Sequence, residues 1–317
     1  MINQAVKGFL ACALLSASFS EAAVKPAAED AVKWLDQMGH ALRHQNYQGI
    51  FTYIRGSTFE TVRIVHRNDE GIETERLFNL NGDVRELFRE NDEVVCYHPD
   101  TGDGELDANH TVQIGPFSPA FSERVISTQN LYRLSMHGED RIAGRRAITL
   151  SISPRFDDRY GYRVWLDKET GLLLQSHKVE RGRVREIFQF TSLEIGGEIE
   201  DTEMASAIAG DTVSHRLALD LNDQAEKPGL RVSWLPDGFR PVRVQGNRLH
   251  FTDGVATFSV FVDRSKGGSM PDMATRVGGT VVITRRLKKS GPQITVVGDV
   301  PVQTARRVAE SVEPVIY

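Results

Sequence analysis

The stretch RYGYRVWLDKETGLLLQSHKVE, residues 159–180, decides the fold because it predicts one complete antiparallel hairpin. Its first half is rich in aromatic and β-branched residues, the polar sequence DKETG supplies a turn, and a leucine-rich second strand follows. Successive side chains of a strand point to opposite faces of a sheet. Both faces of this hairpin therefore carry apolar groups, with Tyr162, Val164 and Leu172 on one and Trp165 and Leu173 on the other.

Apolar residues on both faces fit two architectures. A sheet that is covered by helices on one side and curved round a cavity on the other has this pattern. A plain two-layer sandwich has it as well, and the pattern does not choose between the two. If protein packs both faces of the hairpin completely, the hairpin does not line a lipid pocket.

The same alternation of apolar and polar residues continues along most of the chain. An antiparallel meander is predicted from the stretches at 47–55, 58–67, 73–80, 145–153 and 183–195. The sequence NGD at 81–83 predicts a tight hairpin turn, since asparagine and glycine adopt positive φ readily. Residues 28–44 repeat apolar side chains at three- and four-residue spacing, which predicts an amphipathic helix, and residues 117–134 are expected to form a loop with one or two helices.

The first residues have the three parts of a secretory signal. Lys7 lies in a short basic start, an apolar run extends to Phe19, and small residues follow at Ser20 and Ala22. The apolar run is well short of the roughly 20 residues that span a bilayer. We therefore expect residues 1–22 to be a cleaved signal peptide and the mature protein to be exported.

The rest of the chain divides into two units of different charge. Residues 197–216 lose the alternation and gather acidic and small residues, which predicts a linker between a domain at 23–196 and a smaller one at 217–317. Lysine and arginine outnumber acidic residues in the second unit, although the whole chain has a net charge of −5. Different partners for the two units, or ordinary variation between solvated surfaces, explain this asymmetry equally well.

Common catalytic and metal-binding motifs are absent from the sequence, including GxSxG, GxxxxGK[ST], GxGxxG and HExxH. His40 and His44 are one helical turn apart, but two histidines leave a tetrahedral metal site half empty, and a solvated helix face explains them better. Cys96 is the only cysteine left once the signal is removed, which excludes an internal disulfide. We therefore predict no catalytic residues, no metal and no cofactor.

Two acidic pairs have the residue types of a catalytic carboxylate dyad. Asp92 with Glu93 and Asp157 with Asp158 both fall at predicted strand ends or turns. Solvation of a turn accounts for them more simply than general acid and base chemistry does. Nucleic acid is disfavoured as a partner by export and by the acidic first unit.

Several blocks of the sequence resemble the MucB/RseB family of periplasmic regulators of an envelope-stress sigma factor. They run in order over nearly the whole mature chain: YQGIFTYIRGSTFETVRIVHR (47–67), LNGDVRELFRENDEVVCYHPD (80–100), GRRAITLSISPRFDDRYGYRVWLDKETGLLLQSHKVERGRVREIFQFTSLEI (144–195), WLPDGF (234–239), LHFTDGVATFSVFVD (249–263) and ITVVGDVPVQTARRVAESV (294–312). The resemblance implies an α+β, mainly β fold. Its N-terminal domain would be an unclosed antiparallel β-barrel with helices, like the lipoprotein carriers LolA and LolB, followed by a smaller C-terminal α/β domain.

The resemblance also implies a function without enzymatic activity. Members bind the periplasmic part of a membrane-anchored anti-sigma factor and shield it from the protease that starts its destruction. Lipid or lipopolysaccharide-type amphiphiles from a disturbed outer membrane are thought to release the regulator, and in one branch the sigma factor drives alginate synthesis. The expected location is the periplasm, and the oligomeric state, including a homodimer, stays open.

Candidate site residues follow from the apolar interior and from one basic run. The lipid-cavity candidates are Tyr47, Phe51, Tyr53, Phe78 and Trp165, for each of which an ordinary core position is an equally good interpretation. The candidates for contact with the partner or with an anionic head group are Arg285, Arg286, Lys288 and Lys289, which also fit a solvated loop. A periplasmic lipid or lipoprotein carrier is the main alternative function, and an exported hydrolase is a third.

Overall fold

The computed structural model describes residues 24–90, 93–99, 130–206, 208, 212–217, 230–245, 247–263, 271–287 and 291–314. The expected signal peptide at 1–22, and most of the segment expected to be loop and helix at 117–134, lie outside these residues. Among the helices that the structure describes, none is long and apolar enough to cross a bilayer.

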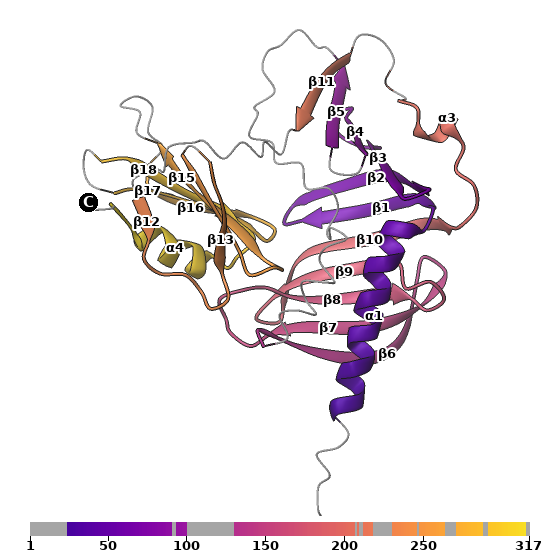
Figure 1. Cartoon of the computed structure of the whole chain (residues 1–317), viewed down its shortest axis with the longest axis horizontal. Coiled ribbons are helices and arrows are strands. Elements are labelled where there is room, and N and C mark those ends of the chain that lie inside the picture. Colours follow the sequence, from indigo (N-terminus) through magenta and orange to yellow (C-terminus); the bar gives the residue numbers. More distant parts are fainter. Residues whose placement is uncertain are drawn as a thin grey trace, which may run out of the picture.

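An eleven-stranded antiparallel sheet forms the N-terminal domain (Figure 1). Its strands are β1 (Tyr47–Arg55), β2 (Thr58–Asp69), β3 (Ile72–Asn79), β4 (Glu86–Glu90), β5 (Glu93–Pro99), β6 (Tyr132–Ile142), β7 (Arg145–Pro154), β8 (Gly161–Asp167), β9 (Leu173–Glu180), β10 (Arg183–Ile195) and β11 (Thr212–Leu217). The order runs β11-β5-β4-β3-β2-β1-β10-β9-β8-β7-β6, with β11 and β6 as the two edges. This unclosed, mainly β domain is the predicted fold class.

Tight turns join the strands at positions where the chain has positive φ. The two-residue loops after β2, β6 and β9 place a non-glycine residue and then a glycine in this conformation: Glu70–Gly71, Ala143–Gly144 and Arg181–Gly182. The tight turn predicted at NGD is wrong. Residues 80–85 form a longer connection there, because Asn81 bonds back to β2, accepting from the Thr61 amide at 2.5 Å and donating to the Phe59 carbonyl at 2.9 Å.

The long helix α1 (Val24–His44) crosses the sheet, as Figure 1 shows for strands β10 to β6. Its apolar stripe is fully buried against one face, which we call the inner face: Ala31, Leu35, Met38 and Ala41. The opposite face of the sheet is the outer face. His40 and His44 are exposed on the side of the helix away from this stripe, with ring centroids 4.5 Å apart. Among the described residues, no group of three or more potential metal ligands occurs.

The segment predicted as a linker is partly built into the N-terminal sheet. Residues 201–204 form the short helix α3 (Asp201–Met204), and β11 pairs with β5 along its whole length. Ile199 and Met204 pack on the outer face against Val65. The acidic residues that suggested a linker bind arginines of β2 instead: Arg63 with Glu203, and Arg67 with Asp201 at 2.7 Å.

The C-terminal domain is a second, smaller sheet with one helix on it. Strands β13 (Arg240–Gln245), β14 (Arg248–Thr252), β15 (Thr257–Asp263), β16 (Met273–Val277), β17 (Thr280–Arg286) and β18 (Gln293–Gly298) lie in the order β13-β14-β15-β18-β17-β16. Helix α4 (Val302–Glu310) packs on β17 and β18 through Ala305, Val308 and Ala309. Strands β12 (Leu230–Val232) and β19 (Val312–Pro314) pair separately.

Candidate functional site

Three of the five cavity candidates lie together on the inner face. Tyr47, Phe51 and Tyr53 occupy alternate positions of β1, so their side chains point the same way. Phe51 contacts Phe188 and Phe190 of β10, with ring centroids 4.9 and 6.0 Å apart. Tyr47 and Phe51 are buried, whereas Tyr53 is half-buried at the edge of the cluster. These aromatic rings form the inner surface of the sheet beside α1.

Phe78 and Trp165 lie on the outer face and do not join the other three candidates. Phe78 pairs with Arg63 across β3 and β2, on the opposite face from Leu77. Trp165 is buried against Ala147 and Leu174, and its indole nitrogen donates to Asp140 at 2.9 Å. The structure therefore does not bring all five side chains to a single cavity.

The hairpin at 159–180 has a bulge that the sequence does not reveal. A register shift after Trp165 pairs Leu166 with Leu173 and leaves Leu174 as the extra residue. Leu173 consequently packs on the inner face, while Leu174 joins Trp165 on the outer face, so the predicted pairing of Trp165 with Leu173 is wrong. The aromatic side chains and leucines of both faces are buried, whereas Val179, near the end of the hairpin, is half-buried.

A polar cluster occupies the inner face on the side of β2, β3 and β4. His66 is fully buried and stacks on Tyr47 at 4.6 Å, with its Nδ1 2.8 Å from the Gln45 carbonyl and its Nε2 3.3 Å from Glu73. Arg89 binds Glu73 at 2.5 Å. Burial alone would raise the pKa of Glu73, but the bonds from His66 and Arg89 outweigh burial and lower it to about 2. Glu73 therefore remains ionised inside this cluster.

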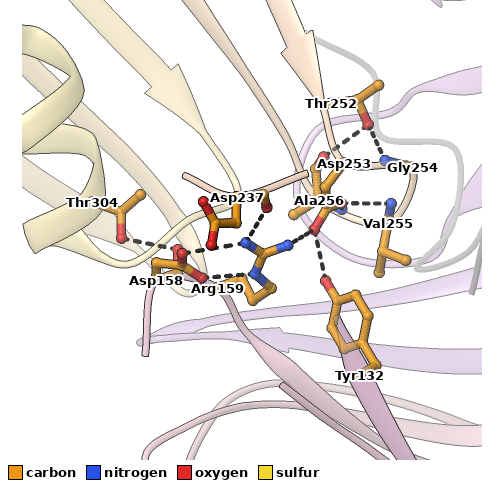
Figure 2. A network of polar contacts seen from close by, with 10 residues as sticks. All are labelled: Tyr132, Asp158, Arg159, Asp237, Thr252, Asp253, Gly254, Val255, Ala256 and Thr304. Atoms are coloured by element: carbon orange, nitrogen blue, oxygen red, sulfur yellow. Dashed lines mark hydrogen bonds and ion pairs between the residues drawn. The ribbon is translucent and has the colours of Figure 1, made fainter. Parts of the chain in front are cut away.

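Buried charges connect the two domains, and the first group centres on Arg159 (Figure 2). Arg159, in the loop between β7 and β8, is 2% exposed and donates to the Asp253 carboxylate at 2.6 Å and to the Asp237 carbonyl at 2.6 Å. Tyr132 of β6 donates to the same Asp253 oxygen at 3.1 Å. Thr304 of α4 donates to the Asp158 carbonyl at 2.9 Å, so three segments of the C-terminal domain meet this one loop.

A second group of buried charges centres on Lys178 of β9. Its ammonium lies 2.7 Å from Glu186 of β10 and 3.0 Å from Asp299, which follows β18. Glu186 also accepts from the Tyr53 hydroxyl at 2.7 Å and from the Gly279 amide at 2.8 Å. Burial would lower the pKa of Lys178, but Asp299 and Glu186 outweigh burial and raise it, so the side chain stays charged.

Sequence reasoning missed this junction. In the sequence, Asp157 and Asp158 form only an acidic pair in a predicted turn, and Asp253 is an ordinary turn residue. Lys178 follows Gln175, Ser176 and His177 in the second strand of the 159–180 hairpin, so no local pattern distinguishes it. Its partner Asp299 is 121 residues away along the chain, which no local pattern can connect.

Of the four basic residues proposed to contact a partner or a head group, the structure describes Arg285 and Arg286. The Arg285 guanidinium donates to the Ala309 carbonyl of α4 at 3.3 Å, and the Arg286 amide donates to Asp272 at 2.8 Å. Both side chains are half-buried. Lys288 and Lys289 lie outside the described residues.

Two family models match nearly the whole described chain. The MucB/RseB N-terminal domain matches residues 30–208, and the MucB/RseB C-terminal domain matches residues 224–313. Over 301 residues the chain is 35% identical to the sigma factor AlgU regulatory protein MucB of Pseudomonas aeruginosa, which covers 90% of this chain and 92% of that protein. The sigma-E factor regulatory protein RseB of Escherichia coli K12 is 27% identical over 292 residues, covering 88% and 89%.

Solved structures agree with the sequence comparisons. The complex of Pseudomonas aeruginosa MucA and MucB contains a chain with 34% identity and a TM-score of 0.71, covering 91% of this chain and 100% of that chain. A crystal structure of MucB gives a TM-score of 0.66 at 33% identity, covering 90% and 98%. An unclosed sheet joined to a smaller second domain is thus the architecture of a class of sigma-factor regulatory proteins. Within that class, this chain belongs to the MucB/RseB family, as its sequence blocks predicted.

Proposed function

We propose that this protein is exported to the periplasm and binds the periplasmic part of a membrane-anchored anti-sigma factor, which it protects from the initiating protease. The observation that carries the proposal is the likeness over 91% of the chain to MucB as solved with MucA. Because the likeness spans both domains and their junction, the whole two-domain body is the unit expected to bind. Negative regulation of the sigma factor, and of alginate production where that sigma factor controls it, would follow.

Release by a lipid or lipopolysaccharide-type amphiphile requires two linked binding equilibria. The partner and the amphiphile must favour different states of the protein, since a ligand with equal affinity for both states releases nothing. An amphiphile that weakens binding of the partner about 100-fold must supply roughly 2.7 kcal/mol of coupling free energy. One acyl chain buried at about 0.8 kcal/mol per methylene can supply that energy. The aromatic inner face formed by Tyr47, Phe51 and Tyr53 is our proposed location for the chain.

A protease-protection assay tests the function. The purified protein is mixed with the periplasmic domain of its anti-sigma factor, and the rate of cleavage by the initiating protease is followed on gels. We expect slower cleavage with the protein present, and recovery of the rate on addition of a long-chain amphiphile. Unchanged cleavage at saturating protein would refute the proposal.

A pair of variants tests the proposed basic contact within the same assay. The Arg286 guanidinium forms no ion pair with any residue that the structure describes, so Arg286→Gln removes a charge that the fold does not use; we expect weaker protection if the basic run meets an acidic partner. Arg240→Gln, at an exposed position on β13, removes the same charge elsewhere and serves as the control. Equal protection by both variants would exclude Arg286 from the contact.

A lipid or lipoprotein carrier is the second candidate, favoured by the aromatic inner face. It predicts that the protein moves an acylated cargo between membranes without any anti-sigma factor. A transfer assay between donor and acceptor vesicles separates the two functions, because a regulator protects its partner without net transfer.

A further inference from the structure

A cavity of about 510 Å³ lies on the outer face of the N-terminal sheet, away from the aromatic inner face. It is lined by β7, β8 and β9 and by the loop that carries Arg159. Gly161 lets the chain fold closely at this point, since a methyl group there would approach the Pro154 ring to 2.8 Å and the Ile152 carbonyl to 2.9 Å.

Most charged groups in the wall of this cavity are bound to a partner. The ion pairs are Arg159 with Asp253 at 2.6 Å, Arg181 with Asp157 at 3.4 Å, and Glu180 with Arg185 at 2.6 Å. Arg163 is different. Its side chain is exposed on β8, it packs over the Trp165 ring at 5.8 Å, and no carboxylate among the described residues forms an ion pair with it.

A serine and a histidine lie beside Arg163, and a second arginine lies two strands away, on β6. Ser151 of β7 and His177 of β9 are its direct neighbours across the sheet, and both line the cavity. Ser153, also in the wall, is exposed and pairs with Arg133 of β6. Arg133 is exposed as well and, within the described part of the chain, forms no ion pair. Arg133 of β6 and Arg163 of β8 thus lie on either side of the strand that carries Ser151 and Ser153, and neither forms an ion pair with a described carboxylate.

His177 contributes no positive charge at neutral pH. Burial lowers its pKa, and the nearby Arg163 guanidinium lowers it further. The ring is held by Gln175, whose amide nitrogen lies 2.7 Å from Nε2. An anion bound at Arg163 would offset the positive charge that disfavours protonation of His177. The pKa of His177 would then rise, so it reports whether the site is occupied.

We propose that this cavity binds a phosphate monoester, with the Arg163 guanidinium as its principal contact and Arg133 and the Ser153 hydroxyl at its edge. A phosphate group offers three strong acceptor oxygens, so it can accept from guanidinium and hydroxyl donors together. The guanidinium fork also matches two of these oxygens at once. Val184, which is 46% exposed in the wall, would contact the apolar part of the molecule that carries the phosphate.

Binding is measured by the fluorescence of Trp165 in the full-length purified protein. The probes are inorganic phosphate, and phosphatidylcholine vesicles with and without phosphatidic acid. We expect a saturable change that is lost in Trp165→Phe, and a dissociation constant at least about tenfold higher in Arg163→Gln, since a charge-assisted bond is lost. Arg240→Gln, an equal charge change outside the cavity, should bind like the unmodified protein.

The two kinds of probe distinguish the source of the phosphate. Binding of inorganic phosphate supports a site for a free phosphorylated molecule, and binding confined to phosphatidic acid vesicles supports a lipid head group. If Arg163→Gln does not fold, Arg163→Lys keeps the charge without the fork and should show a smaller loss. The NMR titration of His177 supplies a second readout, because bound phosphate should raise its pKa. No saturable binding of either probe, or the same affinity in the Arg163 variants, would overturn the proposal.

Discussion

Lys178 of β9 and Asp299, which follows β18, form an ion pair at 3.0 Å that joins the two domains through their interior. Neither side chain is more than 19% exposed, and Glu186 lies 2.7 Å from the same ammonium. The pair therefore fixes the orientation of the domains at a point that solvent and salt screen weakly.

Lys178→Met should lower the free energy of unfolding by about 3–5 kcal/mol, because it leaves Glu186 and Asp299 buried without their cation. Urea denaturation followed by circular dichroism measures the change. Lys33→Met is the matched control, since Lys33 is exposed and its pairing with Asp30 at 3.5 Å is worth little. Similar stabilities for the two variants would mean that the buried triad does not hold the domains together.

Asp253→Asn should loosen the other connection between the domains. The change removes the charge that faces the buried Arg159 guanidinium, so we expect a loss of about 3 kcal/mol or more. Tyr132→Phe removes only the hydroxyl bond to the same carboxylate and should cost about 1 kcal/mol. Small-angle scattering checks the geometry, because Asp253→Asn should increase the radius of gyration and Tyr132→Phe should not.

Gly278→Ala should destabilise the turn between β16 and β17, which docks on the N-terminal domain. Gly278 has φ of +60° and a methyl group there would lie 2.6 Å from the Glu186 carboxylate. Gly71→Ala is the control, since Gly71 also has positive φ but has nothing within 4 Å of the added carbon. Both variants lose about 1 kcal/mol from backbone strain. Gly278→Ala should lose further stability because of the contact with Glu186, and thermal denaturation measures the difference between the two variants. Equal losses of stability would show that this contact is not tight.

Arg163→Gln should raise the pKa of His177, because burial remains while the repulsion from the guanidinium is removed. The folded pKa is depressed below 6.5, so this group contributes stability above pH 6.5 that is lost as the pH falls through the folded pKa. The variant should therefore lose less stability on acidification. Proton NMR of the imidazole resonance checks the shift, with Arg240→Gln, an equal charge change outside the cavity, as the control. A lowered or constant His177 pKa would contradict this account.

The sequence patterns predicted the regular elements well and their exceptions poorly. The α1 stripe and the β8–β9 hairpin follow from periodicity, because burial of one face imposes a repeat on the residues. The bulge at Leu174 could not be predicted, since one extra residue changes the face of a side chain without changing the composition of the strand. The tight turn predicted at NGD is replaced by a longer connection in which the Asn81 side chain bonds to β2, a tertiary contact that the local sequence does not show.

The candidate site residues that share one strand could be placed from the sequence, whereas those on different strands could not. Tyr47, Phe51 and Tyr53 share a face because they alternate within one strand, which a sequence shows directly. Phe78 and Trp165 come from other strands, and their orientation depends on the register of each pairing. The partners of Arg159 and Lys178 are set by domain packing, over separations of 94 and 121 residues.

The pairing of β11 with β5 has a practical meaning for anyone who wishes to separate the domains. An N-terminal fragment that ends at residue 196 would leave the backbone groups of β5 unpaired along a new edge, and such edges recruit other strands and promote aggregation. A fragment extended through Leu217 keeps the edge strand that the whole protein has. The chain thus finishes its first domain with residues that lie beyond the point where the sequence alone would cut it.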